Sequence, residues 1–568
     1  MNDIRRTILW VIFGFSMVLL WDKWQIHNGK KPTFFPSPQT ASAPAASDVK
    51  PVDTSLPQPA ATASAGDVPG AAAGQPAVAA VPRQDVTVAS DVMRLTFDSE
   101  GGTLKASELL KYSDTVDDKK LMQVFEQNAK RVYLGQTGLI GGNFPNHKTP
   151  MTVVPGEREL KDGQDSVQVR FESAEQGGVK LVKTYTLKRG AYDIGVQYDV
   201  VNTGTAAVNP QVYMQLVRDG NKPEHESTFY STFTGPAVYT EAKKYHKVEF
   251  KDIEKNKAEV DKSSTNGYVA MVQHYFASAW LLADGVQRDN FVRKVGDNLY
   301  AVGMITPVGT VEPGQTKSVS ARLFSGPQVE PMLEKLSPGL ELVKDYGWLT
   351  ILAKPLYWLL SELHKFIGNW GWSIVALVVL LKIAFYWFNA KAYSSMAKMK
   401  AINPKIQEMR ERLKDKPQQM QQEMMRIYRE EKVNPMGGCL PIIIQMPVFM
   451  ALYWVLQSSV EIRNAPWIGW IHDLSMPDPF FILPLLMTLS SLLQTALNPA
   501  PPDPMQAKMM WIMPLMFSVM FFFFPAGLVL YWLTNNLLSI AQQWIINKRM
   551  GVPPQFNLPK FGKAAEGK

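Results

Sequence analysis

Residues 370–388 read WGWSIVALVVLLKIAFYWF, an almost wholly apolar run that contains one lysine, Lys382. A helix needs roughly 20 such residues to cross the hydrocarbon of a bilayer, so this run is typical of a membrane-spanning helix. A lysine inside it costs roughly 2.5–3.5 kcal/mol on insertion, and such a residue normally faces a bundle interior or water and is functional. The alternative is that the long side chain of Lys382 snorkels to the nearby headgroups and has no functional role.

Further apolar runs predict a multi-pass α-helical membrane protein with six transmembrane helices. The first lies in residues 1–25, where Arg5 and Arg6 precede Thr7–Trp21. We interpret it as a signal anchor, with a cleaved signal peptide as the alternative. The other spans, which form a five-helix core over residues 368–546, are predicted at Trp370–Phe388, Leu440–Val460, Phe480–Leu497, Met509–Phe524 and Leu528–Ile546.

The distribution of lysine and arginine predicts the orientation of these spans, because cytoplasmic loops are enriched in both. The loop 389–439 and the tail 547–568 are rich in them, whereas the loop 461–479 carries only Arg463. Both termini are therefore expected on the cytoplasmic side of the membrane. The loop 389–439 forms a cytoplasmic helical hairpin, and 547–568 forms a basic tail.

The part of the chain before the core looks soluble. Residues 26–85 are rich in Pro and Ala and predict a disordered tether. Alternating stretches such as Val167–Phe171 then predict a large β-sandwich over residues 86–330, which the anchor would place outside the cytoplasm. Residues 331–367 are apolar but contain several charges, which favours an amphipathic helix at the membrane surface.

Composition excludes several classes of function. Hydrophobic residues make up 46% of the chain and charged ones 19%, and Cys439 is the single cysteine. No metal-ligand spacing, phosphate-binding loop or nucleophile motif is present in the sequence. We therefore expect no enzyme activity, no metal, no cofactor and no DNA partner.

The hairpin carries apolar residues three and four apart on both sides of a break at Asp415-Lys416-Pro417. An antiparallel coiled coil that packs on itself explains most of this stripe. Flexible methionines also suit a surface that receives many apolar partners. The methionines that we predict for the capture of hydrophobic segments are Met396, Met399, Met409, Met420 and Met424.

Polar residues in the other spans are the candidate neighbours of Lys382. They are Gln445, Thr534, Asn535 and Asn536, and none of them is an acid. A lysine without a carboxylate partner argues against a proton relay and for a charge held in water, as in a wet groove.

Several motifs, in order along the helical part, carry a resemblance to a known family. They are Gly368–Gly371 (GNWG), Met396–Met399 (MAKM), Pro404–Gln407 (PKIQ), Asn434–Pro441 (NPMGGCLP) with Gln445–Pro447 (QMP), Trp470–Leu474 (WIHDL) and Phe524–Trp532 (FPAGLVLYW). With these motifs the chain resembles the YidC insertases of Gram-negative bacteria, which are relatives of the mitochondrial Oxa-type and chloroplast Alb-type proteins. The anchor, tether and sandwich resemble that branch in architecture, which implies that the chain lies in the bacterial inner membrane with its sandwich in the periplasm.

The resemblance implies a membrane protein insertase or chaperone with a hydrophilic groove that is closed toward the periplasm. The groove residues it implies are Lys382, Gln445, Tyr531, Trp532, Thr534 and Asn535. Lys382 stands where the family normally has an arginine, so the charge is kept without the bidentate fork of a guanidinium. Val378 and Trp532 also replace polar residues that are common in the family.

The implied partners are nascent membrane-protein clients, the Sec translocon, membrane lipid and, through the basic tail and cytoplasmic loops, the ribosome; the resemblance favours a monomer. Two other readings remain open from the sequence. One is a solute transporter in which Lys382 lines the pathway. The other is a periplasmic envelope-assembly or carbohydrate-binding protein that its helices merely anchor.

Overall fold

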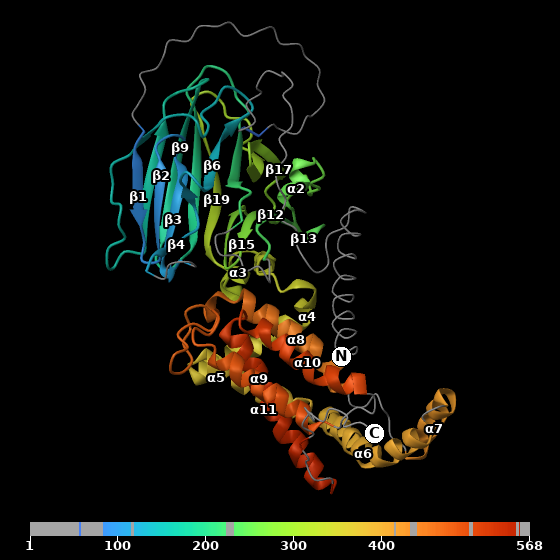
Figure 1. Ribbon diagram of the computed structural model, residues 1–568. Helices are drawn as coiled ribbons and strands as arrows, with labels where there is room; N and C mark the ends of the chain where they lie inside the picture. Colours follow the sequence, from blue (N-terminus) through green and yellow to red (C-terminus); the bar gives the residue numbers. More distant parts are fainter. Residues whose placement is uncertain are drawn as a thin grey trace. The chain divides into compact units, whose positions relative to one another are not determined.

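The structure is a computed structural model that describes residues 56–57, 83–114, 119–222, 232–413, 416–431, 440–498, 504–551 and 556. The predicted signal anchor lies outside the described residues, as do most of the tether and most of the basic tail. Two regions follow along the described chain, one rich in strands and one helical (Figure 1).

The strand-rich region contains two sheets of antiparallel strands. The strands of the first sheet are β1 (Asp85–Ala89), β2 (Met93–Asp98), β3 (Thr103–Ser113), β4 (Leu121–Gln123), β5 (Glu126–Gln127), β6 (Val132–Ile140), β11 (Gln211–Asp219), β14 (Ser263–Ser264), β17 (Arg288–Gly296) and β18 (Leu299–Pro307). Within the described ranges they follow the order β1-β2-β3-β6-β11-β18-β17-β14, with β4 paired to β3 and β5 to β6.

The second sheet follows the order β13-β12-β15-β16-β19-β10-β9-β8-β7. Its strands are β7 (Met151–Val153), β8 (Ser166–Ser173), β9 (Val179–Lys188), β10 (Asp193–Asn202), β12 (Gly235–Thr240), β13 (Lys244–Lys247), β15 (Tyr268–Gln273), β16 (Phe276–Leu281) and β19 (Thr316–Pro327). A short helix, α2 (Phe250–Glu254), follows β13. In the centre of the sheet, Tyr198 on β10 lies opposite Val319 on β19 and Lys183 on β9.

Alternation of apolar and polar residues places one face of a strand in the core, and β8 shows this pattern. On β8, Val167, Val169 and Phe171 are buried, whereas Gln168 and Arg170 between them are exposed. Buried residues of both sheets belong to one continuous hydrophobic cluster. The β-rich domain predicted from this alternation is therefore confirmed.

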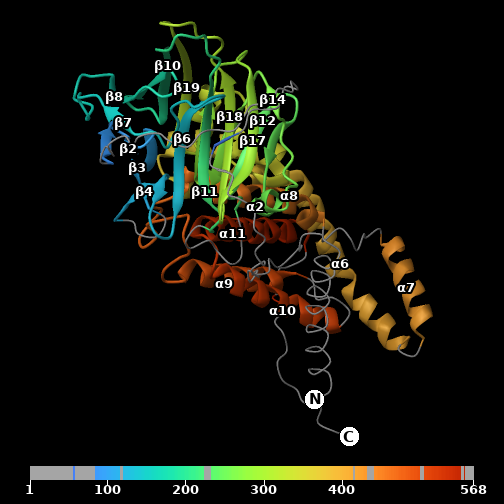
Figure 2. The ribbon, with the colours of Figure 1, turned by 90° about the horizontal axis from the view of Figure 1, so that it is seen from above.

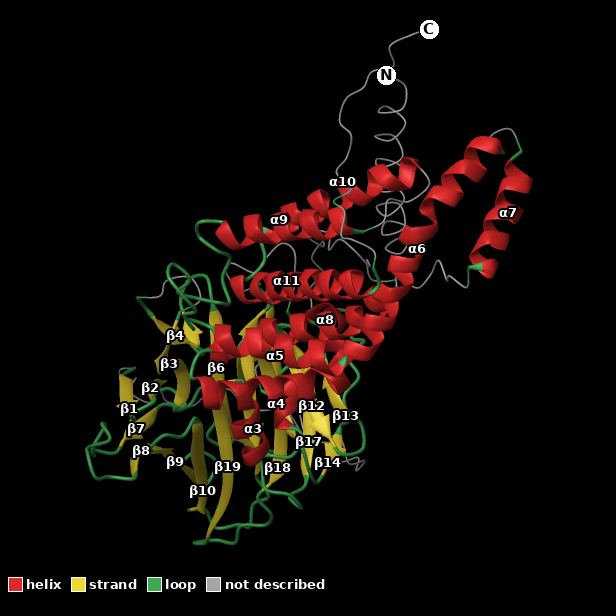
Figure 3. Cartoon of the chain, turned by 90° about the horizontal axis from the view of Figure 1, so that it is seen from below, coloured by secondary structure: helices red, strands yellow, loops and turns green. Residues whose placement is uncertain are grey.

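The helical region begins directly after β19. Its elements are α3 (Glu330–Leu336), the 3₁₀ turns η1 (Leu340–Val343) and η2 (Gly347–Leu349), α4 (Thr350–Ile367), α5 (Trp370–Ala384), α6 (Tyr386–Arg412), α7 (Pro417–Glu430), α8 (Leu440–Ser458), the 3₁₀ turn η4 (Val460–Ile462), α9 (Ile482–Leu497), α10 (Pro504–Phe521) and α11 (Ala526–Arg549). Helix α11 packs against α5, α8 and α9, and α4 packs against α5 and α8 (Figure 3).

The amphipathic helix expected over residues 331–367 is shorter than predicted. Only α4 forms a long helix there, because α3 ends at Leu336: Ser337, which precedes Pro338, is extended (φ −160°, ψ 141°). A second glycine, Gly368 with φ 73°, caps the end of α4, and Asn369 then accepts a hydrogen bond from the Trp372 N–H at the start of α5.

The predicted span Trp370–Phe388 is divided at Phe385, whose backbone leaves the helical conformation (φ −92°, ψ 10°). Within the described part of the chain, no single helix is both long and apolar enough to cross a membrane. Trp370–Ala384 and Tyr386–Met399 meet that test together, but they are bent by 69°. The number of six spans stays a prediction.

The hairpin of α6 and α7 turns at the predicted break before Pro417 (Figure 2). Ile402, Ile406, Met409 and Tyr428 are buried where the two helices meet. Ion pairs border this contact, including Lys405 with Glu431 at 2.6 Å. The self-packed coiled-coil arrangement therefore accounts for most of the apolar stripe.

Candidate functional site

Lys382 lies on the last turn of α5 and points toward α11. Its Nζ donates a hydrogen bond of 2.7 Å to Oγ of Ser539, which in turn donates to the backbone oxygen of Asn535 at 2.7 Å. The side chain is half-buried, and no carboxylate pairs with it among the residues that the structure describes. The positive charge is thus held by a hydroxyl and is not neutralised.

A second polar contact lies beside the lysine. Nε2 of Gln445 on α8 donates to Oδ1 of Asn535 on α11. A small cavity of about 20 Å³ is lined by residues of α5, α6, α8 and α11, including Val378, Lys382, Asn389, Gln445, Tyr531 and Asn535. We call Lys382, Gln445, Asn535 and Ser539 the lysine site. A cavity of this size holds about one water molecule, so a peptide segment would fit only if the helices moved apart.

The structure brings together four of the six predicted groove residues, namely Lys382, Gln445, Tyr531 and Asn535. Trp532 instead packs against Phe449 and Phe521, with ring centroids 4.4 Å and 5.2 Å apart. Thr534 does not line the cavity. The amide of Asn536 faces α9, where it donates to Ser490 at 3.2 Å and Ser491 at 2.9 Å.

Two residues of the site were missed by the sequence argument. Ser539 is the direct partner of Lys382, and Asn389 lines the cavity from α6. A signal for Ser539 was present, because it lies four residues after Asn535 and therefore on the same face of a helix. No comparable signal marked Asn389, which reaches the cavity only because the chain bends at Phe385.

The predicted capture methionines lie mainly inside the hairpin contact. Met409 is only 3% exposed, and Met399, Met420 and Met424 are partly buried against the same cluster. Met396 is half-buried and outside that cluster. Met425, which was not singled out, is 46% exposed. A capture role for the buried methionines therefore requires the hairpin to open.

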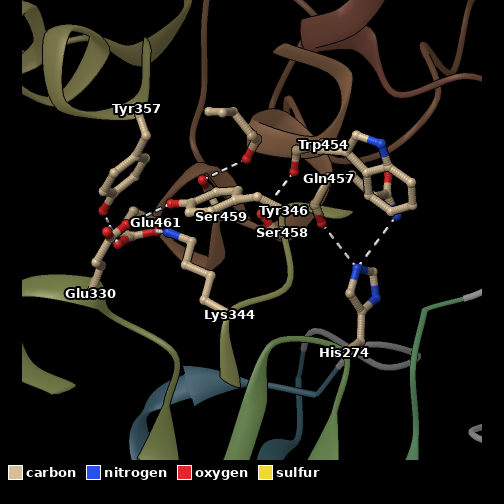
Figure 4. A network of polar contacts seen from close by, with 11 residues as sticks. His274, Glu330, Lys344, Tyr346, Tyr357, Trp454, Gln457, Ser458, Ser459 and Glu461 are labelled. Atoms are coloured by element: carbon tan, nitrogen blue, oxygen red, sulfur yellow. Dashed lines mark hydrogen bonds and ion pairs between the residues drawn. The ribbon is translucent and has the colours of Figure 1, made fainter. Parts of the chain in front are cut away.

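A polar network links the strand-rich domain to the helical region (Figure 4). Nε2 of His274, in the turn between β15 and β16, lies 2.9 Å from the backbone oxygen of Gln457 on α8. Lys344 Nζ lies 3.6 Å from Oε2 of Glu461, and the Tyr357 hydroxyl donates to the other oxygen of this carboxylate at 2.5 Å.

Burial governs the electrostatics of this network. It lowers the pKa of Lys344, although the carboxylates of Glu461 and Glu330 oppose that shift. Burial also lowers the pKa of His274 to about 4, so that its imidazole is neutral at pH 7.

Comparison with known proteins agrees with this architecture. Residues 85–359 match the family described as the YidC periplasmic domain, and residues 362–552 match the family described as the 60Kd inner membrane protein. "Membrane protein insertase YidC" of Cupriavidus metallidurans is 57% identical over 97% of this chain and 98% of its own. The protein of that name from Ralstonia nicotianae is 56% identical with the same coverage of both chains. The chain belongs to the YidC family of membrane protein insertases.

A solved structure described as an active YidC insertase with its first transmembrane domain resolved is also similar. Its identity is 19% and its TM-score 0.38, with 81% of this chain and 92% of that chain covered.

Membership of the YidC family confirms the resemblance noted from the motifs. The family's relatives are insertases and not enzymes, and their names support neither the transporter nor the sugar-binding alternative. Membrane proteins are therefore the clients that family membership implies.

Proposed function

We propose that the lysine site is the polar part of the path along which this insertase moves its clients into the bilayer. The observation that carries the proposal is the charge of Lys382, which lies on an apolar helix and donates a hydrogen bond to a hydroxyl, with no carboxylate partner among the described residues. A charge that is neither paired nor fully hydrated attracts the acidic or polar flank of a client segment. Water enters with that flank and lowers the cost of moving it through hydrocarbon.

Compared with the arginine that is usual at this position in the family, Lys382 alters the strength of the attraction to an acidic client but not its sign. A guanidinium holds a carboxylate through two parallel hydrogen bonds, whereas the ammonium of Lys382 acts as a compact point charge. A client carboxylate would therefore be held less tightly and released more easily. Gln445 and Asn535, which already bond to each other, offer a neutral donor and acceptor to the client backbone.

An apolar surface beside the path would accept the hydrophobic part of the client. Helices α9 and α10 expose large apolar side chains, which include Leu485, Leu486, Leu489, Ile512, Met516, Phe517 and Val519. Helix α4 likewise exposes Ile351, Trp358 and Phe366. Such surfaces suit contact with lipid chains, and burial of the client's own apolar surface in lipid supplies the driving force for insertion.

The orientation proposed for the chain rests on its charges. The basic loop 389–439 and tail 547–568 would lie in the cytoplasm with both termini, and the strand-rich domain would lie in the periplasm. The hairpin would then meet clients before insertion. Its basic residues and the tail could contact anionic lipid or the ribosome, and the Sec translocon is a further proposed partner of a working monomer.

Reconstitution tests the proposal. The purified chain in liposomes should protect the loop of a small two-span client from external protease above the protein-free background. Lys382→Ala should reduce this protection most for clients with acidic translocated loops, whereas Lys382→Arg should retain it, because attraction depends on charge. Lys365→Ala is a matched control, because Lys365 is 65% exposed and pairs with Glu362 on the surface of α4.

The charge of the client separates the possible outcomes. Equal losses for acidic and neutral clients in Lys382→Ala would contradict an electrostatic role of the lysine site. Insertion at background level by the folded wild-type chain would contradict autonomous insertion altogether.

A further inference from the structure

A large cavity lies in the strand-rich domain, far along the chain from the lysine site. Its volume is about 670 Å³. It lies where β4 and β5 adjoin β6 and β11, and the turn between β15 and β16 forms another wall. A cavity of this size matches the volume of a small-molecule site, which is roughly 300–1,000 Å³.

Arg218, near the end of β11, lines this cavity and is unusual for a buried arginine. The residue is only 1% exposed, yet neither Nη1 nor Nη2 has a hydrogen-bond partner among the described residues. Its Cζ lies 5.5 Å from the ring centroid of Tyr133, another lining residue. That aromatic contact attracts the cation but satisfies none of its N–H groups.

The nearby carboxylates are already engaged elsewhere. Asp219, the next residue, accepts the Val132 N–H at 2.7 Å through Oδ2 and the Asn221 N–H at 2.9 Å through Oδ1. Glu108 on β3 forms an ion pair with Arg94 at 2.9 Å. No ion pair involves Arg218 in the ranges that the structure describes, so no described carboxylate neutralises its charge.

The surroundings of Arg218 make this arrangement costly. Burial lowers the pKa of Arg218 to about 10. The like charge of Arg131 lowers this pKa further, whereas Tyr133 and Asp219 raise it. An arginine remains charged at pH 7 even so, and a buried charge without a partner destabilises a fold. An external anion that reaches the guanidinium would remove that cost.

We propose that this cavity is a binding site for a small organic anion whose carboxylate or phosphate group pairs with the guanidinium of Arg218. A guanidinium matches either group through two parallel hydrogen bonds. Tyr133 and Phe276 offer ring surface to the remainder of the ligand. Because residues Gln273–Phe276 both line the cavity and carry His274, which contacts α8, the site adjoins the contact between the two regions. None of the lysine-site residues lines this cavity.

Calorimetry on the full-length chain in detergent tests the proposal with two probes of the same chemistry. Glycerol 1-phosphate represents a soluble anion, and a short-chain phosphatidylglycerol represents a lipid headgroup. At least one of them should bind the wild type. Arg218→Met should weaken that binding by about tenfold or more, because it removes a charge-assisted pair of hydrogen bonds while keeping a similar side-chain length. Arg170→Met, at an exposed position on β8, should leave it unchanged.

Stability without ligand provides a second readout. If Arg218 serves an external anion, Arg218→Met should melt at a higher temperature than the wild type in buffer without either probe, because an unpaired buried charge is gone. The probe should then raise the melting temperature of the wild type but not of the variant. If neither probe binds at concentrations up to about 10 mM, the proposal is overturned. Equal binding of a probe by the wild type and by Arg218→Met would also overturn it.

Discussion

Nζ of Lys344 lies 3.6 Å from Oε2 of Glu461, and this ion pair ties the connector before α4 to the 3₁₀ turn after α8. The lysine side chain is wholly buried and the glutamate is 19% exposed. The distance is longer than a hydrogen bond, and the two atoms have no other hydrogen-bond partner within the described chain. Attraction between the charges, together with the Tyr357 ring 3.7 Å from Nζ, therefore stabilises the lysine.

Removing one member of this pair should be costly. Lys344→Met or Glu461→Gln leaves the other charge buried and is expected to lower the free energy of unfolding by about 3–5 kcal/mol. Pulse proteolysis in urea measures this quantity. The double variant should recover much of the loss, because it leaves no unpaired charge. Lys365→Met, which removes an exposed pair, should cost less than about 1 kcal/mol. Additive losses in the double variant would show that the charges do not interact.

The contact between His274 and α8 should weaken in acid. The pKa of His274 is lowered by burial to about 4, against an ordinary value of 6.5. Protons therefore bind the unfolded state more readily, so the stability from neutral His274 is present above pH 6.5 and is lost as the pH falls toward 4. The full loss is on the order of 3 kcal/mol.

Thermal unfolding followed by tryptophan fluorescence at pH 7 and pH 5 tests this pH dependence. The decrease in stability between the two values should be smaller in His274→Gln, which has no imidazole to protonate. His246→Gln, at an exposed position on β13, should keep the full decrease. The same decrease in all three proteins would mean that other groups are responsible.

Gly371 permits close packing at the start of α5. A Cβ atom at this position would overlap Cδ1 and Cγ of the Trp467 ring, in the loop between α8 and α9. Gly371→Ala is expected to lower the free energy of unfolding by about 1–3 kcal/mol, because the ring must move from a packed position. Gly156→Ala is the matched control, since a Cβ there meets no atom within 4 Å. Equal unfolding energies for the two variants would contradict this packing argument.

The hairpin should depend on its buried methionine more than on its exposed one. Met409→Ala opens space in the contact between α6 and α7 and is expected to cost about 2–5 kcal/mol, which should speed amide hydrogen exchange in both helices. Met425→Ala changes a residue that is 46% exposed and should leave exchange almost unchanged. If both variants exchange alike, the hairpin is not held closed by this cluster.

Client capture by the hairpin can be measured with the same two variants. A photo-reactive client should crosslink more to Met409→Ala than to the wild type if the hairpin must open to expose its apolar stripe. A lower yield would instead favour capture by the closed surface that carries Met425.

Much of the local structure was predictable from the sequence. The period of two around Val167–Phe171 predicted a strand, and β8 spans Ser166–Ser173. The apolar run before Pro525 and the one after Gly527 predicted two helices joined by a short turn, as α10 and α11 are. These features depend on the order of side chains within one segment, which determines the face that each segment buries.

The bend at Phe385 and the end of α3 at Leu336 were not predicted. Apolar composition continues through Phe388, so the pattern alone favoured one straight helix over Trp370–Phe388. Backbone dihedrals at a single residue decide the direction of a helix, and composition carries little information about them.

By itself, the sequence determined the family, the β-rich and helical regions, and the presence of a lysine within an apolar segment. Only the tertiary structure decided which residues meet. Ser539 lies 157 positions from Lys382 yet bonds to it, and Arg218 lines a cavity without a partner among the described residues. The physical reason is that a side chain's neighbours depend on how distant segments pack, whereas the sequence pattern records only which face of each segment avoids water.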